Sequence, residues 1–281
     1  MPALPRSRIA PTPSGYLHLG NAFNFLLTEY LTRRETGILR LRIDDLDAPR
    51  IRREYIADVF ETLHWLGVAT DEGPRDEADY AAHYSQQARL TKYDELLDGL
   101  ATSGKMFACT CSRAEIQRGS TDGQYPGYCR DKALPLDTKN AAWRFRTEPG
   151  DVIAWQDAIC GPLEVSLYGQ ARDFVIRRRD GLPAYHVASL CDDADYGINL
   201  IVRGVDLLES TAVQLHLAAS LGITSFLNCR FYHHPLLQNE AGEKLSKSAG
   251  SSSLKALREA GMPGDELHLM AAEWYRSFLR V

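Results

Sequence analysis

Residues 8–21 read RIAPTPSGYLHLGN, and they join a short apolar segment to a long periodic one. Arg8-Ile9-Ala10 is apolar enough for a buried strand, and the prolines and glycine that follow it force a loop. From Asn21 onward, apolar residues recur at three- and four-residue spacing, which predicts a helix that ends before Gly37. We therefore expect a strand, a loop and an amphipathic helix in this order.

The same alternation continues along the chain. Residues 38–43 form a second apolar segment, and the acidic, proline-containing run 44–49 cannot continue a buried sheet. Helical periods then cover about 51–65 and 82–100. Strands that alternate with helices predict an α/β fold with a parallel sheet, of the doubly wound Rossmann type.

The pattern changes after residue 104. A cysteine-rich loop, a Pro/Gly-rich turn and short alternating strands at 142–146 and 152–159 predict an inserted subdomain. The α/β pattern then resumes with strands at 174–178, 200–203 and 231–233, helices from about 185 and at 207–221, and two short helices near the end. The expected division is 1–104 for the first half of the catalytic-type domain, 105–169 for the insert, 170–235 for the second half, and 236–281 for a polar loop and C-terminal helices.

Composition narrows the class of protein. The 281 residues are 44% hydrophobic and 25% charged, which suits a globular chain. We see neither a run of ~20 apolar residues nor a signal peptide, so we expect a soluble cytoplasmic protein without a membrane partner. The six cysteines do not resemble a disulfide framework. The net charge of −5 gives no global nucleic-acid signal, so RNA contacts would fall to local arginines at 50–53 and 177–179.

Two loops carry the chemistry. In the first, residues 11–21, Gly15 and Gly20 let a nucleotide approach the main chain where a helix begins, and helix N-termini favour phosphate. His18 in that loop can donate a hydrogen bond to phosphate oxygens as charge develops. The second loop contains Lys244-Leu245-Ser246-Lys247-Ser248, whose two lysines can neutralise departing pyrophosphate. The pair of loops is far more specific than either loop alone.

The two loops resemble the HIGH and KMSKS signatures of class I aminoacyl-tRNA synthetases. Residues 8–15, 41–47 and 203–206 are similar to the glutamyl-tRNA synthetase pattern in particular. The resemblance implies that glutamate and ATP, with Mg²⁺, give glutamyl-adenylate and pyrophosphate. His18, Lys244 and Lys247 match the catalytic residues of the family.

The resemblance also implies binding residues. Arg8 and Arg203 match arginines that hold the substrate's side-chain carboxylate, which a planar guanidinium can bind in a bidentate manner. The whole implied glutamate site is Arg8, Ala10, Thr12, Asp44, Tyr185 and Arg203. The implied ATP site is Pro11, Gly15, His18, Gly20, Asn21, Asp206, Leu245 and Lys247. Two positions depart from the family, which usually has glutamate in place of Asp44 and asparagine in place of Ser189.

The length of the chain suggests a subfamily. From a length of 281 residues we expect no separate anticodon-binding domain. In this respect it resembles the glutamyl-queuosine tRNA(Asp) synthetases, which attach glutamate to the cyclopentenediol of queuosine at the wobble position. The resemblance implies a catalytic body that grips the anticodon stem-loop of tRNA(Asp), and we expect a monomer.

The same subfamily implies a structural Zn²⁺ in the insert. Cys109, Cys111 and Cys129 match three thiolate ligands, and Tyr125 matches a phenolate ligand, with Tyr128 as its rival. Thiolates suit Zn²⁺, and a metal would hold an insert too small to build its own core. The remaining cysteines, Cys160, Cys191 and Cys229, are expected to be small buried hydrophobic residues.

Three other functions fit the same residues. A truncated glutamyl-tRNA synthetase would charge the terminal adenosine of tRNA. A glutamyl ligase would act on a small amine or a carrier protein without any RNA. A non-catalytic RNA-binding relic is the third alternative, although a relic has no reason to keep His18, Lys244 and Lys247.

Overall fold

The computed structural model describes residues 4–237 and 253–279. Its strands are β1 Arg6–Ile9, β2 Ile38–Leu41, β3 Met106–Cys109, β4 Ala142–Phe145, β5 Val152–Asp157, β6 Gly161–Ser166, β7 Val175–Arg177, β8 Leu200–Gly204 and β9 Arg230–His234. Its longer helices are α1 Leu19–Arg33, α2 Arg53–Trp65, α4 Leu90–Ala101, α5 Arg113–Gly119, α7 Tyr185–Asp195, α8 Leu208–Leu221, α10 Leu254–Glu259 and α11 Gly264–Arg276. Short helical turns are α3 Glu77–Asp79, α6 Leu167–Gln170, α9 Thr224–Leu227, η1 Ala48–Arg50, η2 Tyr80–Tyr84, η3 Gln86–Arg89 and η4 Val205–Leu207.

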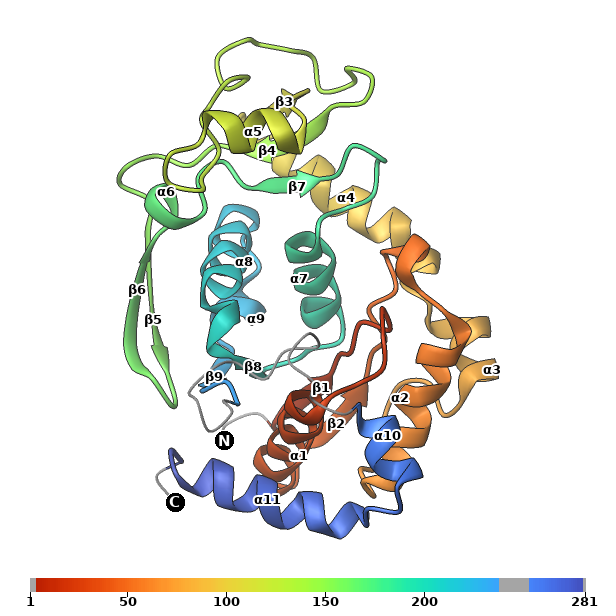
Figure 1. Ribbon diagram of the computed structural model, residues 1–281. Coiled ribbons are helices and arrows are strands. Elements are labelled where there is room, and N and C mark those ends of the chain that lie inside the picture. The colour runs from red at the N-terminus through yellow and green to blue at the C-terminus, as the bar shows by residue number, and fades with distance from the viewer. Residues whose placement is uncertain (1–3, 238–252, 280–281) are drawn as a thin grey trace.

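Parallel strands from both halves of the chain form the centre of the molecule. β1 pairs with β2, and β8 pairs with β9, in both cases in parallel. The backbone N–H of Asn199, just before β8, donates to the carbonyl oxygen of Arg6 in β1 at 3.0 Å, so the two pairs lie side by side. Figure 1 shows α7 and α8 on one side of these strands and α1 and α11 on the other. This confirms the expected α/β arrangement.

The layers are held by two large apolar clusters. One is formed mainly by residues of α4, α7 and α8, with the fully buried Phe145, Leu190 and Phe226 among its members. The other lies between α1, α2 and the C-terminal helices, and it includes Phe25 and Leu267. Burial of such side chains contributes roughly 1.5–3 kcal/mol each and fixes the helices against the strands.

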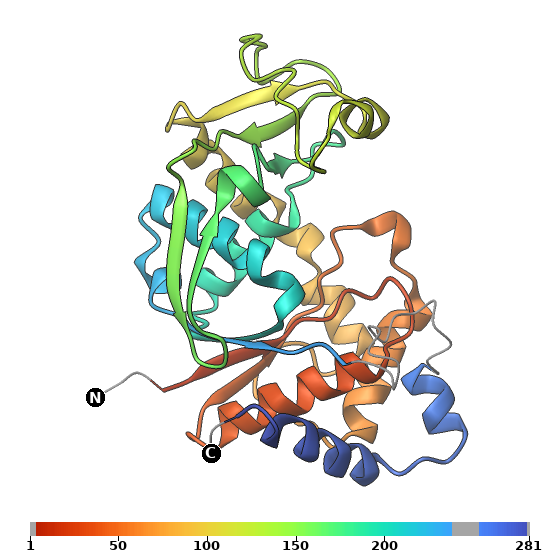
Figure 2. The same cartoon turned by 60° about the vertical axis from the view of Figure 1, so that its left-hand side comes forward.

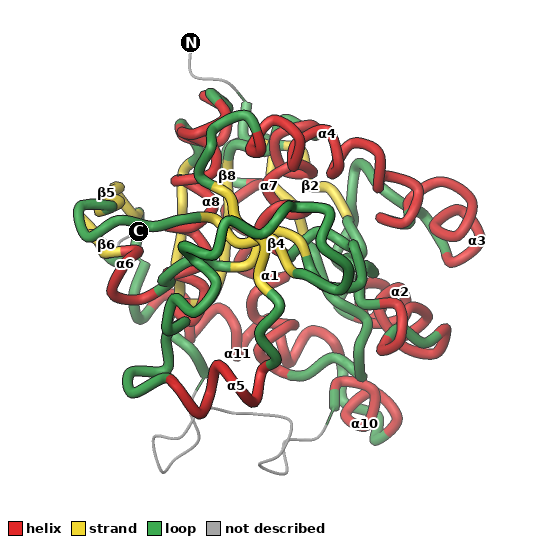
Figure 3. Tube along the Cα trace, turned by 90° about the horizontal axis from the view of Figure 1, so that it is seen from above, coloured by secondary structure: helices red, strands yellow, loops and turns green. Residues whose placement is uncertain are grey.

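The insert is divided between two sheets. β3, β4 and β7 form a separate antiparallel sheet, so this sheet crosses the expected boundary at residue 169. The β5–β6 hairpin instead joins the central strands, because β5 pairs in parallel with β9 at Asp157 and Phe231. Figure 2 shows the hairpin reaching down to the central strands, and in Figure 3 it projects at one side of the molecule.

The prediction of one helix is wrong at its amino-terminal end. The periodicity predicts a helix over 82–100, but the chain forms a π-helical turn, η2, then a break at Ser85 and a 3₁₀ turn before α4 begins at Leu90. The carboxylate of Asp45 accounts for the break. It accepts hydrogen bonds from the Tyr80 and Ser85 hydroxyls, both at 2.5 Å, and from the Gln86 backbone N–H at 2.8 Å.

The other expected elements of the two α/β halves and the two C-terminal helices are confirmed. Within the described ranges, no helix has the length and apolar character needed to cross a membrane. Cys229 is buried as expected and Cys191 is partly buried, but Cys160 is exposed, so its expected burial is wrong.

Candidate active site

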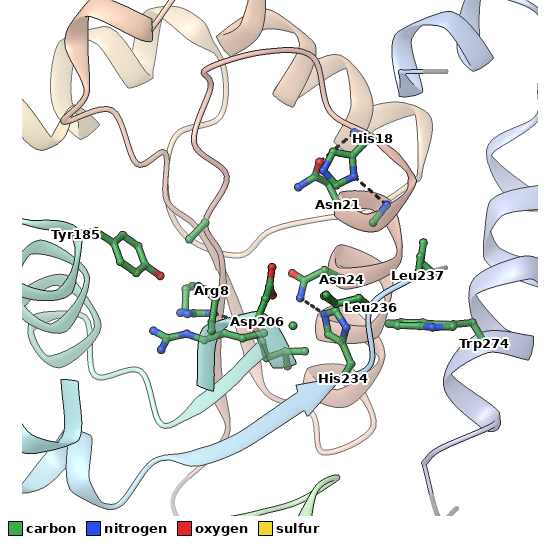
Figure 4. A pocket seen from close by; sticks show the side chains of 16 residues that line it. Arg8, His18, Asn21, Asn24, Tyr185, Asp206, His234, Leu236, Leu237 and Trp274 are labelled. Carbon is green, nitrogen blue, oxygen red and sulfur yellow. Dashed lines mark hydrogen bonds between the residues drawn. The ribbon is translucent and has the colours of Figure 1, made fainter. Parts of the chain in front are cut away.

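A cavity of about 300 Å³ opens where the carboxyl ends of β1, β8 and β9 meet the start of α1. Ligands of open α/β sheets bind at this edge, outside the carboxyl ends of parallel strands. Figure 4 shows Arg8 and Asp206 in the middle of the cavity, between Tyr185 on one side and Trp274 on the other. The cavity is lined by Arg8, Ala10, His18, Gly20, Asn21, Asn24, Tyr185, Val202, Arg203, Gly204, Asp206, Leu207, His234, Leu236, Leu237 and Trp274. We refer to it as the arginine cavity.

Arg8 and Arg203 are buried at the wall of the arginine cavity and share one carboxylate. They are 5% and 3% exposed, and Asp193, which is fully buried, is their common partner. Arg8 Nε donates to Asp193 Oδ1 at 3.1 Å, and Arg203 Nη2 lies 3.6 Å from Asp193 Oδ2. Arg42 Nη1 also donates to Asp193 Oδ1, at 2.7 Å. Three guanidinium groups therefore converge on a single carboxylate.

The guanidinium of Arg203 is incompletely paired. Its Nη1 donates to Gln214 Oε1 at 2.6 Å and to Thr211 Oγ1 at 3.1 Å. Its Nε and Nη2 are buried and have no hydrogen-bond partner in the part of the chain that the structure describes. Burial lowers the pKa of Arg203, and nearby cations including Arg8 add to that effect. An anion in the arginine cavity would supply the missing acceptor.

Asp193 keeps its charge in spite of burial. Burial by itself would raise the pKa of Asp193, but the three guanidinium groups outweigh it and lower that pKa. The Asp193 carboxylate is therefore ionised at neutral pH, and it neutralises one of the three positive charges around it. Breaking such a buried pair by removing one partner costs about 3–5 kcal/mol, because an uncompensated charge stays behind.

A second cavity of about 470 Å³ lies next to the first, and Tyr185 lines both. Its wall includes Thr12, Asp44 and Ser189. The Asp44 carboxylate is held by Arg42, whose Nε and Nη2 donate to the two carboxylate oxygens at 2.6 and 3.1 Å. The structure thus separates the expected glutamate residues into two groups that meet at Tyr185.

Arg42 offsets only part of the effect of burial on the pKa of Asp44. Burial raises the pKa of Asp44, against the opposing effect of Arg42, and the three nearby aspartates raise the pKa of Arg42 well above its usual value. Arg42 Nη2 also donates to the Ser189 hydroxyl at 3.2 Å. Both positions that depart from the family pattern, Asp44 and Ser189, therefore contact the same buried arginine.

His18 begins α1 and faces the arginine cavity. Its Nδ1 accepts a hydrogen bond from the backbone N–H of Gly20 at 3.1 Å, and its own backbone N–H donates to Asn21 Oδ1 at 3.0 Å, which forms a capping box. Because Nδ1 accepts, the proton of the neutral ring is assigned to Nε2. The cap therefore fixes the tautomer that can donate a hydrogen bond from Nε2.

Gly204 and Asp206 shape the cavity at the end of β8. A Cβ added at Gly204 would lie 2.5 Å from Asp206 Oδ1 and 2.9 Å from Leu236 Cδ2, so a larger residue there would displace these two side chains. Asn24 and His234, which the sequence analysis did not select, also line the cavity and are joined by a 2.9 Å hydrogen bond. Asn24 lies one helical turn after Asn21, and this spacing on the same face of α1 is the signal that could have found it.

The structure thus brings together most of the expected site residues. Arg8, Ala10, His18, Gly20, Asn21, Tyr185, Arg203 and Asp206 line the arginine cavity, and Thr12 and Asp44 line its neighbour. Pro11 and Gly15 line neither of these cavities. Lys244, Leu245 and Lys247 lie outside the described residues. Arg42, Asp192 and Asp193, which organise the site, were not selected. Asp192 and Asp193 lie in no local motif, and in the segment 41–47 the resemblance marked Asp44 but not Arg42.

The thiol cluster, which we define as Cys109, Cys111, Cys129 and Tyr125, lies in the insert. The three sulfur atoms fall within 4.8 Å of one another, and Cys111 Sγ is 3.5 Å from Cys129 Sγ. Cys109 Sγ lies 3.3 Å from the Tyr125 hydroxyl, which also accepts a hydrogen bond from the Cys129 backbone N–H at 2.8 Å. Tyr125 is buried at 4% exposure, whereas its rival Tyr128 is 48% exposed.

The donors of the thiol cluster fit a zinc ion. Three sulfurs and one phenolic oxygen are a set that a borderline-soft tetrahedral cation accepts. Burial raises the pKa of Cys111 to about 12, and it also raises the pKa of Tyr125. Burial opposes ionisation of Cys129 too, but hydrogen bonds from Thr110, Cys111 and Tyr125 lower its pKa to about 7. Closely spaced ionisable groups of one sign are compatible with full ionisation only when a cation joins them.

Comparisons with known proteins identify the family of the chain. Residues 6–270 match the family of class I tRNA synthetases (E and Q), catalytic domain. The glutamyl-Q tRNA(Asp) synthetase of Nitratidesulfovibrio vulgaris is 37% identical over 92% of this chain and 82% of its own length. The glutamate–tRNA ligase 2 of Syntrophus aciditrophicus is 36% identical over 92% of this chain. The aligned part is 54% of that ligase, so the chain spans about half the length of this relative.

A solved structure gives the same fold. The crystal structure of glutamate–tRNA synthetase from Elizabethkingia anophelis has a TM-score of 0.81 at 25% identity, over 96% of this chain and 61% of that one. The match of the family model covers nearly the whole chain, and two α/β halves surround a cavity at the expected edge of the strands. The chain belongs to the class I tRNA synthetases (E and Q), and it is a ligase of that family.

Proposed function

We propose that this protein activates L-glutamate with ATP and transfers the glutamyl group to the queuosine cyclopentenediol at the wobble position of tRNA(Asp). The observation that carries the proposal is the buried pair Arg8 and Arg203, which line a cavity and share the single carboxylate of Asp193. We propose further that the protein acts as a monomer in the cytoplasm and contacts the anticodon stem-loop.

The charge of the arginine cavity supports glutamate over glutamine. Arg203 has two buried nitrogen atoms without an acceptor, and a carboxylate supplies both charge and a bidentate geometry. An amide would supply one acceptor and no charge, so a guanidinium would stay uncompensated at a buried site. Tyr185 lines both cavities. On this assignment it lies between the side-chain carboxylate of the bound glutamate and the amino group of the same glutamate.

The start of α1 supports a nucleotide beside the glutamate. The positive end of the helix dipole and the Nε2–H of His18 favour phosphate oxygens, and Gly20 keeps the main chain accessible. Asp206, at the end of β8, is placed by this proposal near the ribose. We assign Lys244 and Lys247, which the structure does not describe, to the pyrophosphate, and Mg²⁺ enters with ATP.

Activation then consists of one displacement. The α-carboxylate of glutamate attacks the α-phosphorus of ATP, a new C–O–P linkage forms, and the bond to pyrophosphate breaks. In the second step a hydroxyl of the acceptor diol attacks the carbonyl of the adenylate and AMP leaves. The protein's contribution is to orient both substrates and to stabilise charge on the phosphates.

The thiol cluster supports a structural zinc ion away from the reacting atoms. Cys109, Cys111, Cys129 and Tyr125 would hold it, and it would stabilise the insert. No step of the reaction passes through this metal.

The experiment separates activation from transfer. Pyrophosphate exchange that depends on glutamate tests adenylate formation without RNA. Transfer of radiolabelled glutamate is then measured with a queuosine-containing anticodon stem-loop whose 3′ end carries a phosphate, so that the queuosine diol is the one remaining diol. The matched control is the same stem-loop with guanosine in place of queuosine.

We expect exchange with glutamate but not glutamine, and label on the queuosine stem-loop alone. Label on the 3′ end of tRNA(Glu) and none on the stem-loop would overturn the acceptor and favour a charging enzyme, a second candidate that the similarity to glutamate–tRNA ligases supports. Exchange without any labelled RNA would point to a small amine or a carrier protein. Absence of exchange would overturn the activation itself.

A further inference from the structure

A buried hydrogen-bonded chain leads from the β5–β6 hairpin to Arg203. Asp157 Oδ2 lies 2.6 Å from His233 Nδ1, and His233 Nε2 lies 2.8 Å from Thr211 Oγ1. Thr211 Oγ1 in turn lies 3.1 Å from Arg203 Nη1. His233 and Thr211 are fully buried, and Asp157 and Arg203 are 1% and 3% exposed.

The direction of the hydrogen bonds is assigned at both ends of this series. Asp157 accepts from His233 Nδ1–H, and Thr211 Oγ1 accepts from Arg203 Nη1. The one hydroxyl proton of Thr211 has two acceptors within reach, His233 Nε2 at 2.8 Å and the Leu207 carbonyl oxygen at 3.0 Å. The Asp157 carboxylate is itself held, because its Oδ1 accepts from the backbone N–H groups of Ile159 and Cys160, both at 2.9 Å.

The four residues come from four elements. Asp157 ends β5, His233 is in β9, Thr211 is in α8 and Arg203 is in β8. Asp157 is also the one residue of the hairpin in register with β9, opposite Phe231. Asp157 therefore has two roles. It joins the insert to the central strands, and it begins the series of hydrogen bonds that ends at the guanidinium of Arg203.

We propose that Asp157, His233 and Thr211 are positioning residues that set the rotation of the Arg203 guanidinium. Thr211 and Gln214 together hold Nη1, and this fixes the plane of the guanidinium. Nη2 then lies 3.6 Å from Asp193 Oδ2, and neither Nε nor Nη2 has a hydrogen-bond partner among the described residues. None of the three positioning residues lines the arginine cavity. The inference rests on the proposed function, since it assumes that Arg203 binds the carboxylate of glutamate.

Rotation matters because bidentate binding depends on the plane of the guanidinium. Two parallel N–H···O bonds form only when the guanidinium and the carboxylate are nearly coplanar. A guanidinium that turns about its terminal bonds keeps its charge but loses this geometry. The chain therefore affects glutamate binding and its discrimination from glutamine more than ATP binding.

The test removes the hydroxyl of Thr211 without changing the shape of the side chain. Thr211→Val should raise the KM for glutamate about tenfold in pyrophosphate exchange, as the loss of a hydrogen bond to a charged group does. The KM for ATP should stay unchanged, and Thr211→Ser should restore the KM for glutamate. Asp157→Asn, which weakens the far end of the chain, should have a smaller effect in the same direction.

The matched control is Ser220→Ala on the same helix. Its hydroxyl donates to the His216 carbonyl at 2.9 Å, within its own helix and outside the chain, so both KM values should stay at the wild-type level. A folding defect is measured separately by thermal denaturation of each variant. Equal increases of the two KM values, or no rescue by Thr211→Ser, would reduce Thr211 to a packing role and overturn the proposal.

A second readout does not depend on activity. In the wild-type protein, the side-chain Nη signals of Arg203 in a ¹⁵N nuclear magnetic resonance spectrum should be resolved because rotation is slow. In Thr211→Val they should merge, and in Ser220→Ala they should not. If glutamate-dependent exchange is absent from the wild-type protein, the proposed function fails, but this spectrum still decides the positioning chain: identical Arg203 signals in both variants would overturn it.

Discussion

The arginine cavity and the thiol cluster both bury polar groups, but they balance them differently. In the arginine cavity, Asp193 offsets part of the charge of three guanidinium groups, and two nitrogens of Arg203 have no hydrogen-bond partner among the residues that the structure describes. In the thiol cluster, three sulfurs and a phenol hydroxyl face one another, and the nearby guanidinium of Arg144 packs on the face of the Tyr125 ring, 3.8 Å from its centroid. Since a buried polar group is stable only when it is compensated, we propose an anionic ligand at the first site and a cation at the second.

The largest expected effect is the loss of the zinc ion that we propose for the thiol cluster. Purified protein should contain one zinc ion per chain, and Cys109→Ser should lose it, because a structural site of this type contributes on the order of 10 kcal/mol of folding free energy in small domains. Metal analysis and thermal denaturation measure the two consequences. The matched control is Cys160→Ser, a cysteine that is exposed and lies outside the cluster, and it should keep both the metal and the melting temperature.

Zinc-free wild-type protein with the same melting temperature as Cys109→Ser would break the comparison. The thiol cluster would then be a group of reduced cysteines, and the arginine cavity alone would require a ligand.

The next largest effect is the loss of glutamate binding by Arg203. Arg203→Ala should lower kcat/KM for glutamate about a thousandfold, since truncating one member of a desolvated charge pair costs about 4 kcal/mol. Pyrophosphate exchange as a function of glutamate concentration measures this loss. Arg230→Ala is the matched control, because that arginine lies on the neighbouring strand β9 and pairs with Glu35 at the surface. Unchanged dependence on glutamate in Arg203→Ala would remove this residue from the substrate site.

His18 sharpens the comparison, since it serves both the fold and the chemistry. His18→Asn should keep the cap of α1, because asparagine is a good N-cap residue, and should slow adenylate formation about a hundredfold through loss of the Nε2 donor. His18→Ala should lose both functions. Single-turnover adenylate formation and thermal denaturation of the two variants separate the effects, and normal turnover in His18→Asn would assign His18 to the cap alone.

The smallest effect is a pH dependence beside the arginine cavity. Burial, assisted by Arg203, lowers the pKa of His186 to about 4, whereas an unfolded histidine has a value of about 6.5. The contribution of His186 to stability is therefore complete above pH 6.5 and is lost as the pH falls toward 4, at up to about 1.4 kcal/mol per pH unit.

His186→Phe should remove this part of the pH dependence. Denaturant unfolding of both proteins at pH 7, 6 and 5 gives the difference, and His83→Gln is the control because His83 is exposed and pairs with Asp79. Parallel stability curves for wild type and His186→Phe would contradict the prediction.

Much of the fold could be predicted from the sequence because its signals are local. The apolar spacing after Asn21 and the acidic run at 44–49 set the ends of α1 and β2 within a few residues. Pairing between distant strands has no such local signal, so the attachment of Asp157 to the central strands was not predicted. The break at Ser85 was missed for the same reason, since it depends on a carboxylate 40 residues earlier.

The candidate site also contains residues that a local pattern predicts and residues that it does not. Arg8, His18 and Arg203 lie in motifs that resemble a known family, and the structure brings all three to one cavity. Asp193 lies in a segment with the pattern of an ordinary helix, and Arg42 lies in the segment 41–47, where the resemblance marked Asp44 instead. Their contact appears only when the two halves of the chain meet. Gln214 and Thr211 on α8 were missed because polar residues of a helix are usually exposed, whereas these two are fully buried.

The pairing of Arg8 with Asp193 has a consequence for synthesis on the ribosome. The two residues are separated by 185 positions, so a nascent chain that has emerged only through its first half contains Arg8 and Arg42 without their shared counterion. Contacts of such long range form late and slow the folding of a domain. β1 and β2 can pair within the amino-terminal half, but Arg8 and Arg42 reach Asp193 only after α7 has left the exit tunnel. We therefore expect the arginine cavity to be among the last parts of the protein to be completed.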